Sequence, residues 1–199
     1  MLLKKIYRKI FTKKKYDDSI TLQFIGSAQP KVDIGKHTYM NGVKLYCWDN
    51  RFQLNIGKYC SMADDISIIA GGEHDKDWVS TYPFIDRWNL NEYNHLKHPR
   101  YKGNISIEND VWIANGVTIL SGVKIGNGAI IGACTVVSKD VPPYAIAIGN
   151  PMRILKFRFS KETIEALLDI KWWDWTESKI ISNQELFTKP ENFIKELKK

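Results

Sequence analysis

The sequence predicts a mostly-β solenoid, in which short parallel strands stack turn upon turn, and two interleaved series of residues predict it. Branched apolar residues recur at every sixth position: Ile107, Ile113, Ile119, Ile125, Ile131 and Val137. A small or branched residue follows each by four positions: Val111, Val117, Val123, Ala129, Thr135 and Val141. An α-helix spaces apolar residues by three and four, and a strand by two. A period of six therefore indicates strands of about four residues joined by tight turns.

The residue pairs between the two series favour tight turns. Five of the six are Asn109-Asp110, Asn115-Gly116, Ser121-Gly122, Asn127-Gly128 and Lys139-Asp140. Most contain Asn, Asp or Gly, which tolerate a positive φ at low cost. We therefore place the corners of the solenoid at these pairs.

A rougher run of the same period precedes the regular one. Its inward positions are Ala28, Ile34 and Met40, followed by Ile56, Met62 and Ile68, with Cys60 read as a small core residue. The phase slips between Met40 and Ile56, so we expect Tyr46, Trp48 and Arg51 to lie in a longer corner or bulge. The repeat is absent between residues 68 and 107. A loop displayed by a rigid scaffold is where function is usually found.

These patterns divide the chain into three regions. We expect a basic N-terminal segment at 1–17, a solenoid domain at 18–155 with its functional loop at 70–104, and a helical extension at 156–199. Ser160 is the expected N-cap of the first helix, and Pro190 begins the last one. The tryptophans at 172–175 are expected to pack as part of a helical lid against the solenoid's end. The basic segment is read as a docking helix or tail in preference to a membrane-contacting amphipathic helix.

Composition narrows the function classes. The chain of 199 residues carries a net charge of +7, concentrated at its ends, and no nucleic-acid-binding motif accompanies it. No apolar run approaches the ~18 residues that span a bilayer, and the N-terminus lacks the apolar core of a signal peptide. The three cysteines are scattered and odd in number, which is typical of a reducing, cytoplasmic location.

Several motifs together resemble one enzyme family. They are Ile-Gly-Lys-Tyr-Cys-Ser at 56–61, Gly-Gly-Glu-His at 71–74 with Trp78 and Ser-Thr-Tyr-Pro-Phe at 80–84, Asn-Asp-Val-Trp-Ile at 109–113, Ser-Lys-Asp-Val-Pro-Pro-Tyr at 138–144, Gly-Asn-Pro at 149–151, and Asp-Ile-Lys-Trp-Trp-Asp-Trp at 169–175. Between about residues 32 and 180 the chain resembles the xenobiotic acetyltransferase branch of the hexapeptide acyltransferases. That branch includes streptogramin acetyltransferases and the hexapeptide type of chloramphenicol acetyltransferase.

The resemblance implies a left-handed parallel β-helix that assembles as a homotrimer, with acetyl-CoA bound in a groove between subunits. Matching the motifs residue by residue assigns Asn115 and Ala133 to the pantetheine arm of the cofactor. It assigns four more residues to the nucleotide and its phosphates: Ser138, Lys139, Arg153 and Lys156. The acceptor pocket is assigned to Trp78, Tyr82 and Phe84. For Lys139 and Arg153, ordinary solvated surface is the alternative, and for some of the aromatic residues it is loop packing.

His74 is the candidate catalytic residue. Transfer of an acetyl group from a thioester to a hydroxyl requires a base, and an unperturbed imidazole titrates near ~6.5, which suits that role. The base would pass the proton to the departing thiolate, so no covalent acyl-enzyme is needed. A backbone carbonyl or one of Glu73, Asp75 and Asp77 is expected to fix its tautomer. A packed loop histidine is the alternative, which the Gly-Gly-x-His context disfavours.

The acceptor is the open question. Residues 85–94 differ from the drug-modifying members of the family, so we expect a sugar or surface-polysaccharide precursor, with an antibiotic as the alternative. A metal-dependent hydratase would need converging histidines, and the regular repeat contains none. The His95 and His98 pair is read as surface, because its spacing alone is weak evidence for a metal. An inactive scaffold would not need the histidine loop and the basic C-terminal set together.

Overall fold

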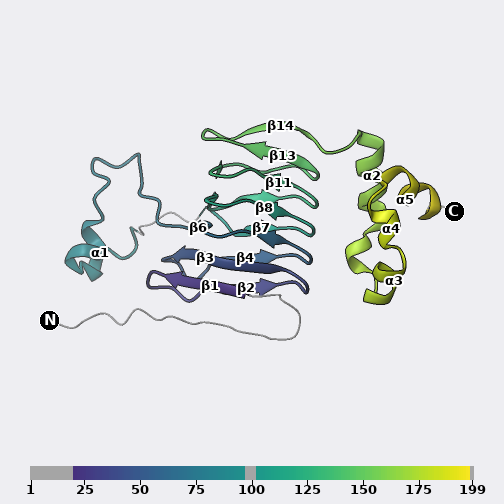
Figure 1. Cartoon of the computed structure of the whole chain (residues 1–199). Helices are drawn as coiled ribbons and strands as arrows, with labels where there is room; N and C mark the ends of the chain where they lie inside the picture. The colour runs from purple at the N-terminus through teal and green to yellow at the C-terminus, as the bar shows by residue number, and fades with distance from the viewer. Residues whose placement is uncertain (1–19, 97–101, 198–199) are drawn as a thin grey trace.

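The computed structural model describes residues 20–96 and 102–197, and its strands lie one above another in successive turns of the chain (Figure 1). The strand pairings form three parallel stacks. The first stack contains β2 (Lys31–Ile34), β4 (Gln53–Ile56), β7 (Ile105–Ile107) and β10 (Lys124–Ile125). The second contains the first half of β3 (Tyr39–Cys47), then β5 (Ser61–Met62), β8 (Trp112–Ile113), β11 (Ile130–Ile131) and β13 (Ala145–Ile148). The third contains the second half of β3, then β6 (Ser67–Ala70), β9 (Thr118–Leu120) and β12 (Val136–Val137). The strand β1 (Ile20–Ile25) pairs with β3, and β14 (Arg153–Phe157) pairs antiparallel with β13.

The six-residue period becomes a parallel ladder with one turn of the chain per rung. Ile107 pairs with Ile125, and Ile113 pairs with Ile131, so each residue stacks on the one 18 positions later (125 − 107 = 18). Three hexapeptides therefore make one turn. Every member of both six-step series is buried, with at most 3% of its surface exposed. The predicted inward positions of the regular repeat are confirmed.

The earlier turn is longer than the repeat predicts. Met40 pairs with Met62, which is 22 positions later (62 − 40 = 22). The extra length lies in the turn that follows β3, because Leu45 and Ile56 are 11 positions apart (56 − 45 = 11) where the regular repeat has six. Beside Gly42, whose φ is +71°, the chain is one residue shorter than in the next turn: Met40 to Leu45 spans five positions (45 − 40 = 5) and Met62 to Ile68 spans six (68 − 62 = 6). The prediction that Tyr46 lies in a corner is wrong, because β3 continues through it. Only Trp48 and Arg51 lie in the turn.

The turns between stacks line up along three edges of the solenoid. The first edge, between the first and second stacks, carries Tyr59, Asp110 and Tyr144. The second edge, between the second and third stacks, carries residues 114–117, 132–135 and 149–152. The third edge carries residues 121–123 and 138–140, and the long excursion at 71–104 leaves from it. The residues of the excursion that are described include α1 (Phe84–Trp88) and the 3₁₀ turn η1 (Asn91–Tyr93).

The C-terminal helices cover the first edge of the solenoid (Figure 1). They are α2 (Lys161–Ile170), the 3₁₀ turn η2 (Trp172–Asp174), α3 (Glu177–Ser182), α4 (Gln184–Phe187) and α5 (Pro190–Leu197). The Ser160 side chain accepts from the amide of Thr163, as the predicted N-cap requires. The predicted lid against the solenoid's end is wrong. The Trp172 ring lies 5.0 Å from that of Tyr59, so the helices lie along the side of the stack.

None of the helices in the described part of the chain is both long enough and apolar enough to cross a membrane. The predicted basic segment at 1–17 lies outside the described residues. The choice between a docking segment and a membrane-contacting helix therefore stays a prediction.

Candidate active site

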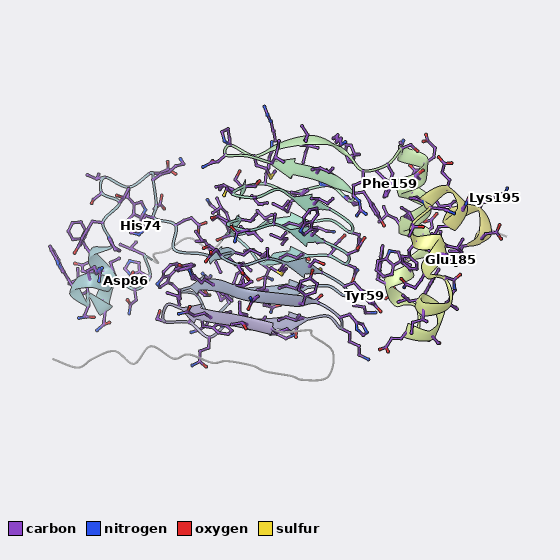
Figure 2. All side chains as sticks on the ribbon, viewed as in Figure 1. Tyr59, His74, Asp86, Phe159, Glu185 and Lys195 are labelled. Carbon is purple, nitrogen blue, oxygen red and sulfur yellow. The ribbon has the colours of Figure 1, made fainter. Side chains whose placement is uncertain are left out.

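His74 lies in the excursion, on the side of the solenoid opposite the C-terminal helices (Figure 2). The excursion begins after β6, where Gly71 and Gly72 have φ values of +84° and +88°. Such values suit glycine and carry the chain sharply away from the third edge. His74 itself is exposed. A rigid stack of strands therefore presents an imidazole to solvent on a loop anchored at one edge.

The imidazole of His74 is oriented by the backbone of its own loop. Its Nδ1 atom lies within hydrogen-bonding distance of the carbonyl oxygen of Thr81. A carbonyl oxygen only accepts, so Nδ1 must carry the proton and donate it. The neutral ring then has its lone pair on Nε2, the nitrogen that can accept a proton from another molecule. The geometry selects the tautomer that a general base needs.

The three acidic neighbours of His74 take part in other contacts. Glu73 lies 3.5 Å from the ammonium of Lys102, and Asp77 lies 2.6 Å from that of Lys76. Asp75 is buried, and its carboxylate accepts from the amide of Asp77 at 3.0 Å. Among the orienting groups that the sequence left open, the backbone carbonyl is the one for which the structure gives a clear geometry.

The three aromatic residues predicted for the acceptor come together. Trp78, Tyr82 and Phe84 line one cavity of about 370 Å³ with Val79, Ser80, Pro83 and Ile85. The rings of Tyr82 and Phe84 lie 4.8 Å apart. The Ser80 hydroxyl accepts from the amide of Tyr82. The other side chains that line the cavity are mainly apolar. Thr81, whose carbonyl holds His74, lies in the same segment.

The residues predicted for the cofactor divide between two edges. Asn115 and Ala133 stack in successive turns of the second edge, where the amide of Cys134 donates to the carbonyl of Asn115 at 3.0 Å. Arg153 follows the hairpin at that same edge and pairs with Ile148.

The remaining three residues lie elsewhere. Ser138 and Lys139 are exposed on the third edge, and Lys156 is exposed on β14, paired with Ile146 and farther from the second edge than Arg153. Within one chain, the structure does not gather all of these residues around His74.

Two groups at the site were not predicted from the sequence. The Thr81 carbonyl is a backbone atom, which no residue pattern marks. Ser121, at a corner of the repeat, accepts from the amide of Gly71 at 2.6 Å and donates to the carbonyl of Ile69 at 3.0 Å. Its place on the third edge, one turn after the excursion, is the only signal that the sequence offers.

Ligands for a metal do not cluster in the described residues. Within 20–96 and 102–197, no three His, Cys, Asp or Glu side chains converge on one point. The hydratase alternative therefore has no ligand set within the described part of one chain.

The chain is similar to known proteins in its repeat and over most of its sequence. Residues 104–139 match the model of the bacterial transferase hexapeptide, six repeats. The chain is 36% identical to a chloramphenicol acetyltransferase of Klebsiella aerogenes, over 76% of this chain and 79% of that protein. It is 44% identical to a probable macrolide acetyltransferase of Lysinibacillus sphaericus, over 68% and 77% of the two chains.

A solved structure agrees with these relatives. The hexapeptide-repeat acetyltransferase of Vibrio cholerae superposes with a TM-score of 0.51 at 25% identity, covering 70% of this chain and 73% of that one. The extent of these matches, together with the repeat and the histidine loop, shows that the chain is an acetyltransferase and belongs to the xenobiotic acetyltransferase family of hexapeptide-repeat enzymes.

Proposed function

We propose that the chain is an acetyl-CoA-dependent O-acetyltransferase in which His74 is the general base. The observation that supports this most strongly is the contact between Nδ1 of His74 and the carbonyl of Thr81. Because that contact fixes the tautomer, Nε2 is set to take a proton from the acceptor hydroxyl as it attacks. Nε2 then returns this proton to the departing thiolate, so one residue serves both halves of the reaction.

The exposed side chains on the second and third edges suit the donor. Acetyl-CoA supplies the acetyl group as a thioester, and its phosphates are the anionic part to be bound. Arg153, Lys139 and Lys156 are exposed cations that fit phosphate oxygens. Ser138 lies beside Lys139, and Asn115 and Ala133 offer backbone and small side chains to the pantetheine arm. These roles follow the family assignment of each residue.

The separation of His74 from Asn115 within one chain supports a site shared between copies. We infer that the solenoid winds left-handed and assembles as a homotrimer, so that the third edge of one copy faces the second edge of its neighbour. The outer face of the second stack agrees with this arrangement. There Tyr39 and Trp112 are 45% and 52% exposed, and both pair with Ser61. Exposed aromatic rings in register on one face favour contact with another molecule.

The acceptor that fits the cavity best has an apolar face beside its hydroxyl. Trp78, Tyr82 and Phe84 provide apolar walls, and a relative of 44% identity is named a probable macrolide acetyltransferase. We therefore place an antibiotic-like alcohol ahead of the sugar that the sequence favoured. The sugar stays a second candidate because the same exposed rings offer flat surfaces for a pyranose.

The test is release of free thiol from acetyl-CoA with chloramphenicol, a macrolide, a streptogramin and simple sugars as separate acceptors. His74→Ala should lower kcat by about 10²–10⁴-fold with an unchanged melting temperature. His95→Ala is the matched control, since His95 is an exposed histidine of the same excursion. Undiminished turnover by His74→Ala would contradict the proposed base. Turnover of sugars alone would restore the second candidate.

A further inference from the structure

The three residues that precede His74 each contact a different part of the chain: two contacts are with the solenoid, and the third is with the returning end of the excursion. Gly71 donates to Ser121, Gly72 lies against the indole of Trp48, and Glu73 pairs with Lys102. We propose that Ser121 is a positioning residue for the acetyl-transfer reaction, acting by fixing the point at which the histidine loop leaves the third edge. This inference rests on the proposed role of His74 as general base.

The hydroxyl of Ser121 acts as both acceptor and donor. The side chain is only 8% exposed, and its oxygen accepts from the amide of Gly71 at 2.6 Å while its hydrogen is directed to the carbonyl of Ile69 at 3.0 Å. These two backbone groups lie on either side of Ala70, where β6 ends and the excursion begins. A single side chain from the next turn therefore sets both the end of the strand and the start of the loop.

The neighbour of Ser121 contacts the other end of the excursion. A Cβ atom at Gly122 would lie 2.6 Å from the carbonyl oxygen of Lys102, so the returning chain packs directly on this glycine. Lys102 in turn reaches Glu73 at 3.5 Å. The Ser121-Gly122 corner therefore contacts both ends of the loop, and Ser121 fixes the outgoing end.

A small displacement at Gly71 would be transmitted to the imidazole. Only Gly72 and Glu73 separate it from His74, and Gly72 is pressed against Trp48, where an ideal Cβ would lie 3.0 Å from the ring. A general base must lie within hydrogen-bonding reach of the proton that it removes. Misplacement by about 1 Å can cost ~10²-fold in rate. Loss of the Ser121 hydroxyl also leaves the Gly71 amide without this acceptor.

The experiment compares three variants of the full-length enzyme. Ser121→Ala removes both hydrogen bonds, and Ser121→Thr keeps the hydroxyl. Ser106→Ala is the control, a serine of the same solenoid on β7. For each we would measure kcat, KM for acetyl-CoA, the melting temperature, and hydrogen–deuterium exchange of the amides at 71–82. Ser121→Cys, which has a similar shape and a weaker donor, replaces the alanine variant if that one yields little folded protein.

We expect Ser121→Ala to lower kcat by at least about tenfold with an unchanged KM for acetyl-CoA, because the cofactor residues lie outside the excursion. Exchange at 71–82 should accelerate, while Ser121→Thr and Ser106→Ala stay within twofold of the wild type in kcat. A kcat for Ser121→Ala within twofold of wild type would overturn the proposal, as would a threonine variant as slow as the alanine variant. The exchange measurement does not depend on the identity of the base. Failure of His74→Ala to lose activity would therefore be seen separately from failure of the Ser121 contacts.

Discussion

Replacing Gly72 by alanine would place a methyl group against the indole ring of Trp48, one residue before Glu73 and two before His74. The ideal Cβ at this position lies 3.0 Å from Cε3 and 3.1 Å from Cζ3 of the ring. Carbon atoms in van der Waals contact are normally about 3.5–4.0 Å apart. The backbone at Gly72 also has a φ of +88°, which a residue with a side chain rarely adopts.

Both effects can be given a magnitude. Left-handed backbone costs about 1–2 kcal/mol for a residue other than glycine, and overpacking costs about 1–3 kcal/mol. Trp48 is 43% exposed and is able to shift outward, so the lower part of the second range applies. A local cost of about 2–3 kcal/mol is enough to move the loop off its anchor. We expect kcat to fall by about tenfold or more, with a smaller change in global stability because a surface loop yields before the core.

Two other glycines allow the effect of backbone strain to be separated from the effect of the contact with Trp48. Gly42 has a φ of +71° with no atom within 4 Å of an ideal Cβ, and Gly71 has a φ of +84° with its nearest neighbour at 4.0 Å. Gly42→Ala should lower the free energy of unfolding by about 1–2 kcal/mol, measured in urea, and leave kcat unchanged. Gly71→Ala strains the loop without the ring contact and should show the smaller loss of kcat. Wild-type kcat in Gly72→Ala would refute the idea that Trp48 holds the loop.

Four further outcomes follow from burial and charge. A thiol reagent should label one cysteine in the native protein, the exposed Cys134, and should reach the buried Cys47 and Cys60 only in denaturant; fast labelling of all three would contradict the packing. Burial raises the pKa of the Cys60 thiol to about 11, above the ~8.5 of a free thiol. Its contribution to stability is therefore complete below about pH 8.5 and is lost as the pH rises through about 11, a dependence that urea melts should show and Cys60→Ala should lack. Ile113→Ala should cost about 2–5 kcal/mol of unfolding free energy by creating a cavity in the fully buried ladder, and a cost below 1 kcal/mol would contradict it. Lys139→Ala should raise KM for acetyl-CoA severalfold with kcat unchanged, because a phosphate contact is the same in ground and transition states; an unchanged KM would remove Lys139 from the cofactor site.

The regular part of the fold was predictable because its repeat is a geometric constraint. Once Ile113 and Ile131 stack in one ladder, every sixth position must face inward. The earlier turn was less predictable because two irregularities of opposite sign lie close together: the segment beside Gly42 is one residue shorter than its partner in the next turn, and the turn after β3 is longer than the repeat. The docking of the helices on the first edge depends on contacts such as Tyr59 with Trp172, which are distant in sequence.

The candidate site was predictable in part for the same reason. His74 was found because it interrupts a regular pattern, and the aromatic residues at 78–84 were found through motif resemblance. Thr81 contributes a backbone oxygen, so its identity as a threonine carries no information about its role. Ser121 belongs to the repeat, where a serine at a corner has an ordinary explanation as a turn residue. Only the pairing of turns shows that this corner lies above the root of the loop.

The helices along the first edge change how the solenoid should unfold. In a simple repeat protein each turn contacts only its neighbours, so terminal turns fray independently of the rest. Here one helical layer contacts successive turns at once: Glu177 lies 3.2 Å from His37, Asp174 lies 2.8 Å from Lys58, and Arg158, at the entry to α2, lies 3.5 Å from Asp110. Loss of one turn therefore loosens contacts that other turns share. We therefore expect the helical layer to make the turns of the solenoid unfold together, including the turns that carry the His74 loop.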